Sequence, residues 1–138
     1  MNILVIDAQG GGIGRQLVAL FKAELPQATV RAVGTNAAAT SAMLKAGADE
    51  AATGENAVVV ACRKANAIVG PIGIVIADAL MGEITPRMAC AVAQSAAKRI
   101  LIPINHCDNI VVGVSSLNRA SLLQEALEEL KKDCACAL

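Results

Sequence analysis

Four glycines follow the first apolar run of this 138-residue chain, and their type and spacing predict chemistry more clearly than any other residues. The stretch from Val5 to Phe21 reads VIDAQGGGIGRQLVALF. Residues without a Cβ let a phosphate approach the backbone, and a helix that starts there adds free N–H groups and a positive dipole end. The predicted phosphate-binding residues are Gln9, Gly10, Gly11, Gly12, Ile13 and Gly14. Asp7, at the end of the apolar run, is expected to contact a ligand or the amides of the loop.

The glycine spacing agrees only in part with known phosphate-binding motifs. A G-x-G-x-x-G pattern that begins at Gly10 has Arg15 in its last place, and no Gly-Lys-Ser/Thr follows as the Walker A motif requires. The spacing G-x-x-x-G-x-G fits Gly12 and Gly14, with Ala8 in the first place. The alternative is a tight strand-to-helix turn with close backbone packing and no ligand.

Later strand ends supply further candidates for the same site. Dinucleotide sites carry a carboxylate after the second strand, but this chain has Thr35 and Asn36 there, which either contact a ribose or 2′-phosphate or cap the next helix. Gly70 and Pro71 end the fourth predicted strand, where the backbone passes close to a ligand or to a neighbouring loop. Asn105 ends the fifth.

Several polar residues near these ends have simpler interpretations. His106 and Cys107 are adjacent, so on an extended segment they face opposite ways and make a poor catalytic pair. The alternatives are two separate residues that line the edge of a pocket, or a loop with no chemistry. Cys134 and Cys136 are expected to be incidental in a frayed tail, with a soft-metal site as the alternative. Glu83 is expected to be exposed to solvent.

Apolar runs alternate with helical patterns along the whole chain. This alternation predicts a doubly wound α/β fold of the Rossmann type, with three layers and a mostly parallel sheet of about six strands. Residues 1–132 are expected to form a single domain and residues 133–138 a short tail. Strands are predicted at 2–7, 28–34, 50–53, 66–71, 98–104 and 109–114. Helices are predicted from Gly12, from Ala37 to a cap at Gly47, from a cap at Thr53, from Thr85-Pro86, and near the C-terminus.

The composition excludes some classes of partner. Phe21 is the only aromatic residue and Lys+Arg equals Asp+Glu at 12 each, so neither base stacking nor charge favours nucleic acid. The run between Lys64 and Asp78 is too short to span a bilayer, and no export signal is visible. A cytoplasmic protein is therefore expected. A hydrophobic content of 55% favours a homodimer or higher homo-oligomer, with the segment 72–82 as a candidate interface.

Two resemblances extend this interpretation. The Gly-Ile-Gly at 12–14 resembles the glycine loop of short-chain dehydrogenases, whose Tyr-x-x-x-Lys pair has no counterpart in a chain without tyrosine. The motifs VIDAQGGGIG, GTNAAATSAMLKAGA, ATGENAVVV, IVGPIG, MGEITPRMA and ILIPIN together resemble a small bacterial family of uncharacterised Rossmann-like proteins, a domain of unknown function. That resemblance implies a stand-alone cytoplasmic domain and supplies no activity.

Three hypotheses follow from these observations. The first is a module that binds a phosphate-bearing nucleotide, with NAD or NADP as the favoured cofactor. The second is a small enzyme that uses Asp7, Asn105, His106 or Cys107 at the same edge of the sheet. The third is a homo-oligomeric structural or interaction protein with no nucleotide ligand.

Overall fold

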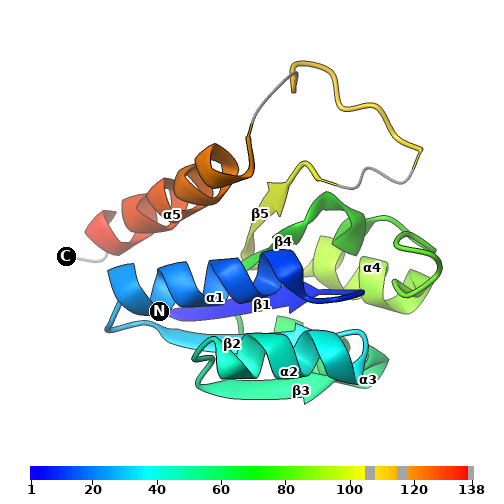
Figure 1. Cartoon of the computed structure of the whole chain (residues 1–138), viewed down its shortest axis with the longest axis horizontal. Coiled ribbons are helices and arrows are strands. Elements are labelled where there is room, and N and C mark those ends of the chain that lie inside the picture. The colour runs from blue at the N-terminus through cyan, green and yellow to red at the C-terminus, as the bar shows by residue number, and fades with distance from the viewer. Residues whose placement is uncertain (105–107, 115–117, 137–138) are drawn as a thin grey trace.

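The computed structural model describes residues 1–104, 108–114 and 118–136 and shows a parallel sheet with helices on both faces (Figure 1). Its strands are β1 (Asn2–Asp7), β2 (Thr29–Gly34), β3 (Glu50–Thr53), β4 (Ala67–Pro71) and β5 (Lys98–Ile102). The helices are α1 (Gly12–Glu24), α2 (Ala37–Lys45), α3 (Glu55–Cys62), the short 3₁₀ helix η1 (Ile72–Val75), α4 (Pro86–Gln94) and α5 (Arg119–Cys136).

The strand order is β3-β2-β1-β4-β5, with every neighbouring pair parallel. This is the order of the first five strands of a doubly wound dinucleotide-binding sheet, in which the chain reverses its direction of progress next to β1. The register places Asp7 of β1 beside Gly34 of β2. The carboxyl ends of β1 and β2 therefore meet at the edge of the sheet where such proteins bind ligands.

Two apolar cores lie on the two faces of the sheet. On one face, Phe21 of α1, Met43 of α2 and Leu127 of α5 are each 0% exposed against one set of strand residues. On the other face, Val58 of α3 and Val92 of α4 are also 0% exposed, against the alternate set. Burial of alternate residues on both faces explains why the strands read as continuous apolar runs.

The predicted sixth strand at 109–114 is absent from the sheet, and that prediction was wrong. Residues 108–114 contain no strand; a turn lies at 112–113, Ile110 is 90% and Val112 93% exposed, and Gly113 has a φ of 88°. Only residues 103–108 separate β5 from this run, whereas a crossover between parallel strands takes a dozen or more residues. The β-branched composition of the run indicates a strand, but the connection is too short to deliver a parallel one.

Helix starts agree with the sequence except at α3. Thr53, the predicted cap, is the last residue of β3, and its Oγ1 hydrogen-bonds with Oγ1 of Thr40 at 2.7 Å. Gly54, with a φ of 100°, takes the cap position in its place. The prediction failed because the strand continues one residue further than the cap position allows.

The apolar segment 72–82 is η1 followed by turns, in agreement with the expected short helix or buried loop. Ile74 (0% exposed), Ala79 (3%) and Leu80 (4%) pack in the protein's own core, whereas Met81 is 95% exposed. The core thus explains part of the segment's apolar composition, and self-association through the segment stays a prediction. Within the described residues, none of the helices combines the length and apolar content that a bilayer crossing requires.

The start of α4 is a specific test of the local structure. Thr85 Oγ1 accepts a hydrogen bond from the Met88 amide at 3.1 Å, with Pro86 in the first turn. We expect Thr85→Ala to lower the free energy of unfolding by about 1 kcal/mol, because an orphan helix amide loses its acceptor. Thr85→Ser keeps the oxygen and should retain most of that stability. Urea denaturation of both variants checks this, and equal losses would contradict it.

Candidate functional site

The carboxylate of Asp7 ties the glycine loop to the end of β1. Asp7 is 5% exposed. Its Oδ1 accepts from the Ala8 amide at 2.8 Å and its Oδ2 from the Gly14 amide at 2.6 Å. The Asp7 carboxylate thus accepts from a backbone amide in the first turn of α1, at the positive end of the helix dipole. Of the two contacts expected for Asp7, a ligand or the loop amides, the structure shows the loop amides.

Two of the four loop glycines are required by the fold. Gly11 has a φ of 69°, and a Cβ there would lie 2.8 Å from Cα of Ala39. A Cβ on Gly14 would lie 2.5 Å from Sδ of Met43 and 2.8 Å from Cβ of Asp7. Gly11 therefore makes the turn against α2, and Gly14 allows α1 to pack closely on β1. Ile13 is 5% exposed and packs in the core.

The other two glycines are not required by the fold. Gly10 and Gly12 have no left-handed φ, and a Cβ on either would have no atom within 4 Å. No described residue accepts a hydrogen bond from the amide of Gly10 or of Gly12. The loop thus has open space and unpaired amides where a ligand could approach the backbone.

Glu83, expected from the sequence to be exposed, is instead half-buried against the glycine loop. Its Oε2 accepts from the Gln9 amide at 2.8 Å, from Asn36 Nδ2 at 3.0 Å and from the Thr35 hydroxyl. The turns that follow η1 therefore cross the carboxyl edge from β4 to β2. Sequence reasoning missed this contact because Glu83 lies 47 and 48 positions from Asn36 and Thr35. One signal in the sequence could have indicated the contact. Glu83 lies in the loop that follows β4, a strand next to β1, and this loop begins at the carboxyl edge of the sheet.

Thr35 and Asn36 lie at the predicted edge, and their polar groups are engaged within the protein. Asn36 Oδ1 accepts from the Ala39 amide at 2.9 Å and caps α2, which was the alternative interpretation of this residue. Its Nδ2 also donates to the Gln9 carbonyl at 2.9 Å. Gln9 has a φ of 52°, uncommon for a residue with a side chain, and these bonds hold it there.

The remaining predicted site residues either serve the packing of the sheet or lie outside the described part of the chain. A Cβ on Gly70 would lie 2.4 Å from the Ile6 carbonyl oxygen, so this glycine permits close contact between β4 and β1. Pro71 is buried at the end of β4 and precedes η1. Asn105 lies outside the described residues, as do His106 and Cys107. Their predicted roles stay predictions.

The C-terminal cysteines lie near the end of α5, which continues through residues 133–136. Cys134 is exposed on this helix. Among the residues whose placement is described, no three of the types His, Cys, Asp and Glu come together as a metal site. A separate cavity of about 370 Å³ lies between β2, β3 and α3, with Arg31, Val60 and Lys64 in its lining, and it includes none of the predicted site residues.

The two carboxylates at the loop differ in their acidity. Burial raises the pKa of Asp7 above its ordinary value; the amides of Gly14, Ala8 and Ile13 act in the opposite direction, and the Glu83 charge adds to the rise. Partial burial acts to raise the pKa of Glu83 as well, but the hydrogen bonds from Gln9, Thr35 and Asn36 outweigh it and lower the pKa. The pKa values of the two carboxylates are therefore shifted in opposite directions.

The strand order, the glycine loop at the end of β1 and the helices on both faces define a Rossmann-like α/β protein. The chain belongs to the family described as a domain of unknown function (DUF3842), whose family model matches residues 2–135. This agrees with the resemblance to an uncharacterised Rossmann-like family noted from its motifs.

Similarity to other known proteins is confined to the fold. None of the curated proteins compared with the chain matches it. One similar solved structure is the crystal structure of a dodecameric FMN-dependent Ubix-like decarboxylase from Escherichia coli O157:H7. It is 18% identical, with 96% of this chain and 75% of that chain covered and a TM-score of 0.46. No ligand or assembly is transferred from it to this chain at that level of similarity.

The glycines divide into two pairs with opposite expected effects on stability. Gly11→Ala and Gly14→Ala should each lower the free energy of unfolding by about 1 kcal/mol or more, because the first strains the backbone and the second clashes with Met43 and Asp7. Gly10→Ala and Gly12→Ala should change it by less than about 0.5 kcal/mol. Chemical denaturation of the four variants measures this. A loss at Gly12 equal to that at Gly14 would show that the loop packs differently.

Asp7 should give stability a characteristic dependence on pH. Because its pKa is raised in the folded protein, the folded state favours the protonated form, and this contribution is fully present below the unfolded value near 3.8. It is lost as the pH rises through the folded-state pKa. The unfolding free energy of the wild type minus that of Asp7→Asn should therefore decrease from pH 3.5 to 7. The subtraction removes the shared titration of other groups, and a constant difference would contradict the assignment.

Proposed function

We propose that the protein binds a phosphate-bearing nucleotide at the glycine loop, with the nicotinamide dinucleotides as the favoured class. The observation that carries this proposal is the pair Gly10 and Gly12, which the fold does not require. Neither glycine has a left-handed φ, and neither would bring a Cβ into contact with the protein. A Cβ at these positions would instead occupy the space through which a ligand reaches the backbone.

The position of the pair supports a phosphate as the group that approaches. Gly12 is the first residue of α1, so its amide lies at the positive end of the helix dipole. Asp7 already accepts from the amides of Ala8 and Gly14 beneath the loop. The amides of Gly10 and Gly12 are left for a ligand. They lie at the carboxyl edge beside β1, where the strand order changes direction and ligands of such sheets bind.

The ligand is identified by thermal unfolding against NAD, NADP, FMN, FAD, ATP and coenzyme A. A ligand at about 100 times its dissociation constant stabilises the folded state by roughly 2.7 kcal/mol. For a chain of this size the midpoint should rise by on the order of 10 °C. We expect Gly12→Ala to keep the stability of the wild type and to lose most of this shift, because its Cβ obstructs the phosphate.

Gly47→Ala is the matched control. Gly47 follows α2 at the opposite edge of the sheet and has a φ of 110°. The substitution should lower stability and leave the ligand-induced shift unchanged, the reverse of Gly12→Ala. If no nucleotide shifts the wild type, and mass spectrometry of the denatured protein finds no bound small molecule, the proposal is wrong.

A further inference from the structure

Glu83 is held at the end of β2 more firmly than a surface carboxylate would be. Three donors from two strand ends converge on its Oε2: the Gln9 amide, the Thr35 hydroxyl and the Asn36 side-chain amide. One of these donors is a backbone group, and Asn36 is itself fixed as the cap of α2. The position and orientation of the carboxylate are therefore set before any ligand arrives.

The second oxygen of this carboxylate is available to a ligand. Among the described residues, no donor is within hydrogen-bonding distance of Glu83 Oε1. Because the hydrogen bonds to Oε2 lower the pKa of Glu83, the group stays ionised and acts as an acceptor only. Its preferred ligand partner is a hydroxyl or another hydrogen-bond donor.

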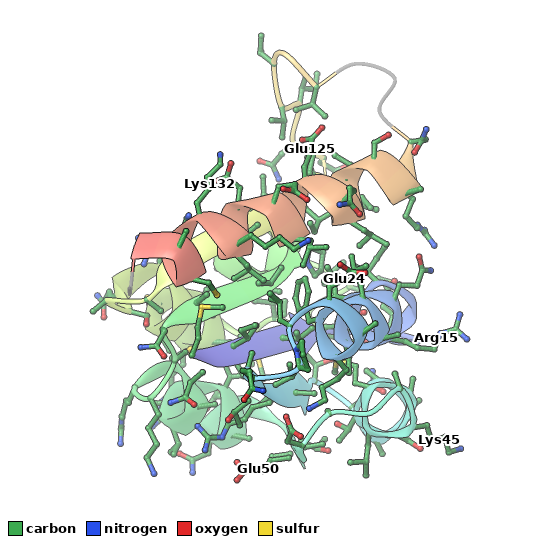
Figure 2. The ribbon with its side chains drawn as sticks, turned by 90° about the vertical axis from the view of Figure 1, so that its left-hand side faces the viewer. Arg15, Glu24, Lys45, Glu50, Glu125 and Lys132 are labelled. Atoms are coloured by element: carbon green, nitrogen blue, oxygen red, sulfur yellow. The ribbon has the colours of Figure 1, made fainter. Side chains whose placement is uncertain are left out.

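No cation neutralises the negative charge at this edge within the part of the chain that is described. The ion pairs recorded between described residues include neither Glu83 nor Asp7. Arg15, the cationic residue nearest to the glycines in sequence, is exposed and projects outward from α1 (Figure 2). A second anionic group placed beside Glu83 would meet like charge with no described cation to offset it, which disfavours its binding.

We propose that Glu83 determines the specificity of the site, accepting the ribose hydroxyls of the bound nucleotide and excluding nucleotides with a 2′-phosphate. This inference rests on the proposed nucleotide binding at the glycine loop. In dinucleotide-binding sheets a carboxylate at the end of the second strand contacts the ribose 2′-hydroxyl. Here β2 ends in Gly34, which has no side chain. The carboxylate at the end of β2 is that of Glu83, in the loop after β4, on the other side of β1.

Thr35 and Asn36 are positioning residues in this arrangement. The sequence leaves two alternatives for them, contact with a ribose or 2′-phosphate and capping of the next helix. In the structure the Thr35 hydroxyl and the Asn36 amide both donate to Glu83. Their effect on a nucleotide is exerted through the orientation of that carboxylate.

The test compares ligands that differ only at the 2′ position. Calorimetric titration gives the dissociation constants of NAD, NADP, ATP and 2′-deoxy-ATP for the wild type and for Glu83→Gln. We expect the wild type to prefer NAD to NADP, and ATP to 2′-deoxy-ATP, by at least tenfold. Glu83→Gln should reduce each preference at least tenfold, because the neutral amide neither repels a phosphate nor accepts as strongly.

Two sets of controls separate specificity from structural damage. Glu125→Gln makes the same chemical change on α5, where Glu125 lies on the outer surface (Figure 2), and should leave both preferences unchanged. Thr35→Val should weaken the preferences and Thr35→Ser should restore them. General damage to the site would weaken both members of each pair equally and leave the ratios unaltered.

The outcomes distinguish this inference from the function on which it rests. If the wild type binds a nucleotide, Gly12→Ala abolishes binding and Glu83→Gln leaves the ratios unchanged, the role of Glu83 is wrong and nucleotide binding stands. If Glu83→Gln instead gains affinity for inorganic phosphate, Glu83 fills an anion site, and the inference is also wrong. If the wild type binds none of these four nucleotides, the role of Glu83 is wrong, and the thermal-unfolding panel with FMN, FAD and coenzyme A decides separately whether nucleotide binding stands.

Discussion

The hydrogen bonds of Asp7 to the loop are the constraint on which the rest of the site depends. A carboxylate at the end of β1 accepts from the amide beside it and from the third residue of α1. For the second bond to form, α1 must lie almost against the strand, and only a residue without a side chain fits at Gly14. That close approach fixes where the loop turns. The loop in turn presents the Gln9 amide to Glu83 and leaves the amides of Gly10 and Gly12 unpaired.

Two carboxylates therefore serve the same loop by different physical means. Asp7 is enclosed, and removal from water favours its neutral form. Glu83 keeps its charge because three donors surround one of its oxygens. The first group acts within the protein, since both its oxygens are used by the backbone. The second has one oxygen left over, and this asymmetry makes it the better candidate for contact with a ligand.

Much of the architecture could be predicted from the sequence, because burial on both faces of a parallel sheet leaves continuous apolar runs between helical patterns. The five observed strands and the proline-marked start of α4 follow directly from such local signals. The false strand at 109–114 has the right composition, but the short preceding connection excludes a parallel crossover. The cap at Thr53 failed because strand pairing with Gly34 took priority over a local motif.

The site could be predicted only where it is local. The loop and Asp7 are contiguous in sequence, so their proximity was predictable. The sequence could not show which glycines the fold requires, because that requirement comes from contacts with Ala39 and Met43 of α2. The contact of Glu83 with the glycine loop and the end of β2 was the main feature of the site that the sequence did not predict. Two strands, two α-helices and η1 separate Glu83 from even its nearest partner in sequence, Asn36, and no periodicity or spacing in a single sequence records such a contact.

The placement of Glu83 also makes one edge of the sheet depend on elements that are far apart in the chain. The three donors that hold it belong to the end of β1 and to the junction of β2 with α2, all at or before Asn36 in the chain. The turn that carries the carboxylate leaves from β4, so these contacts require β4 to be paired with β1 on the side opposite β2. During synthesis the N-terminal strands can pair and turn before this segment leaves the ribosome. The edge is therefore complete only when a residue from the second half of the chain has joined elements from the first.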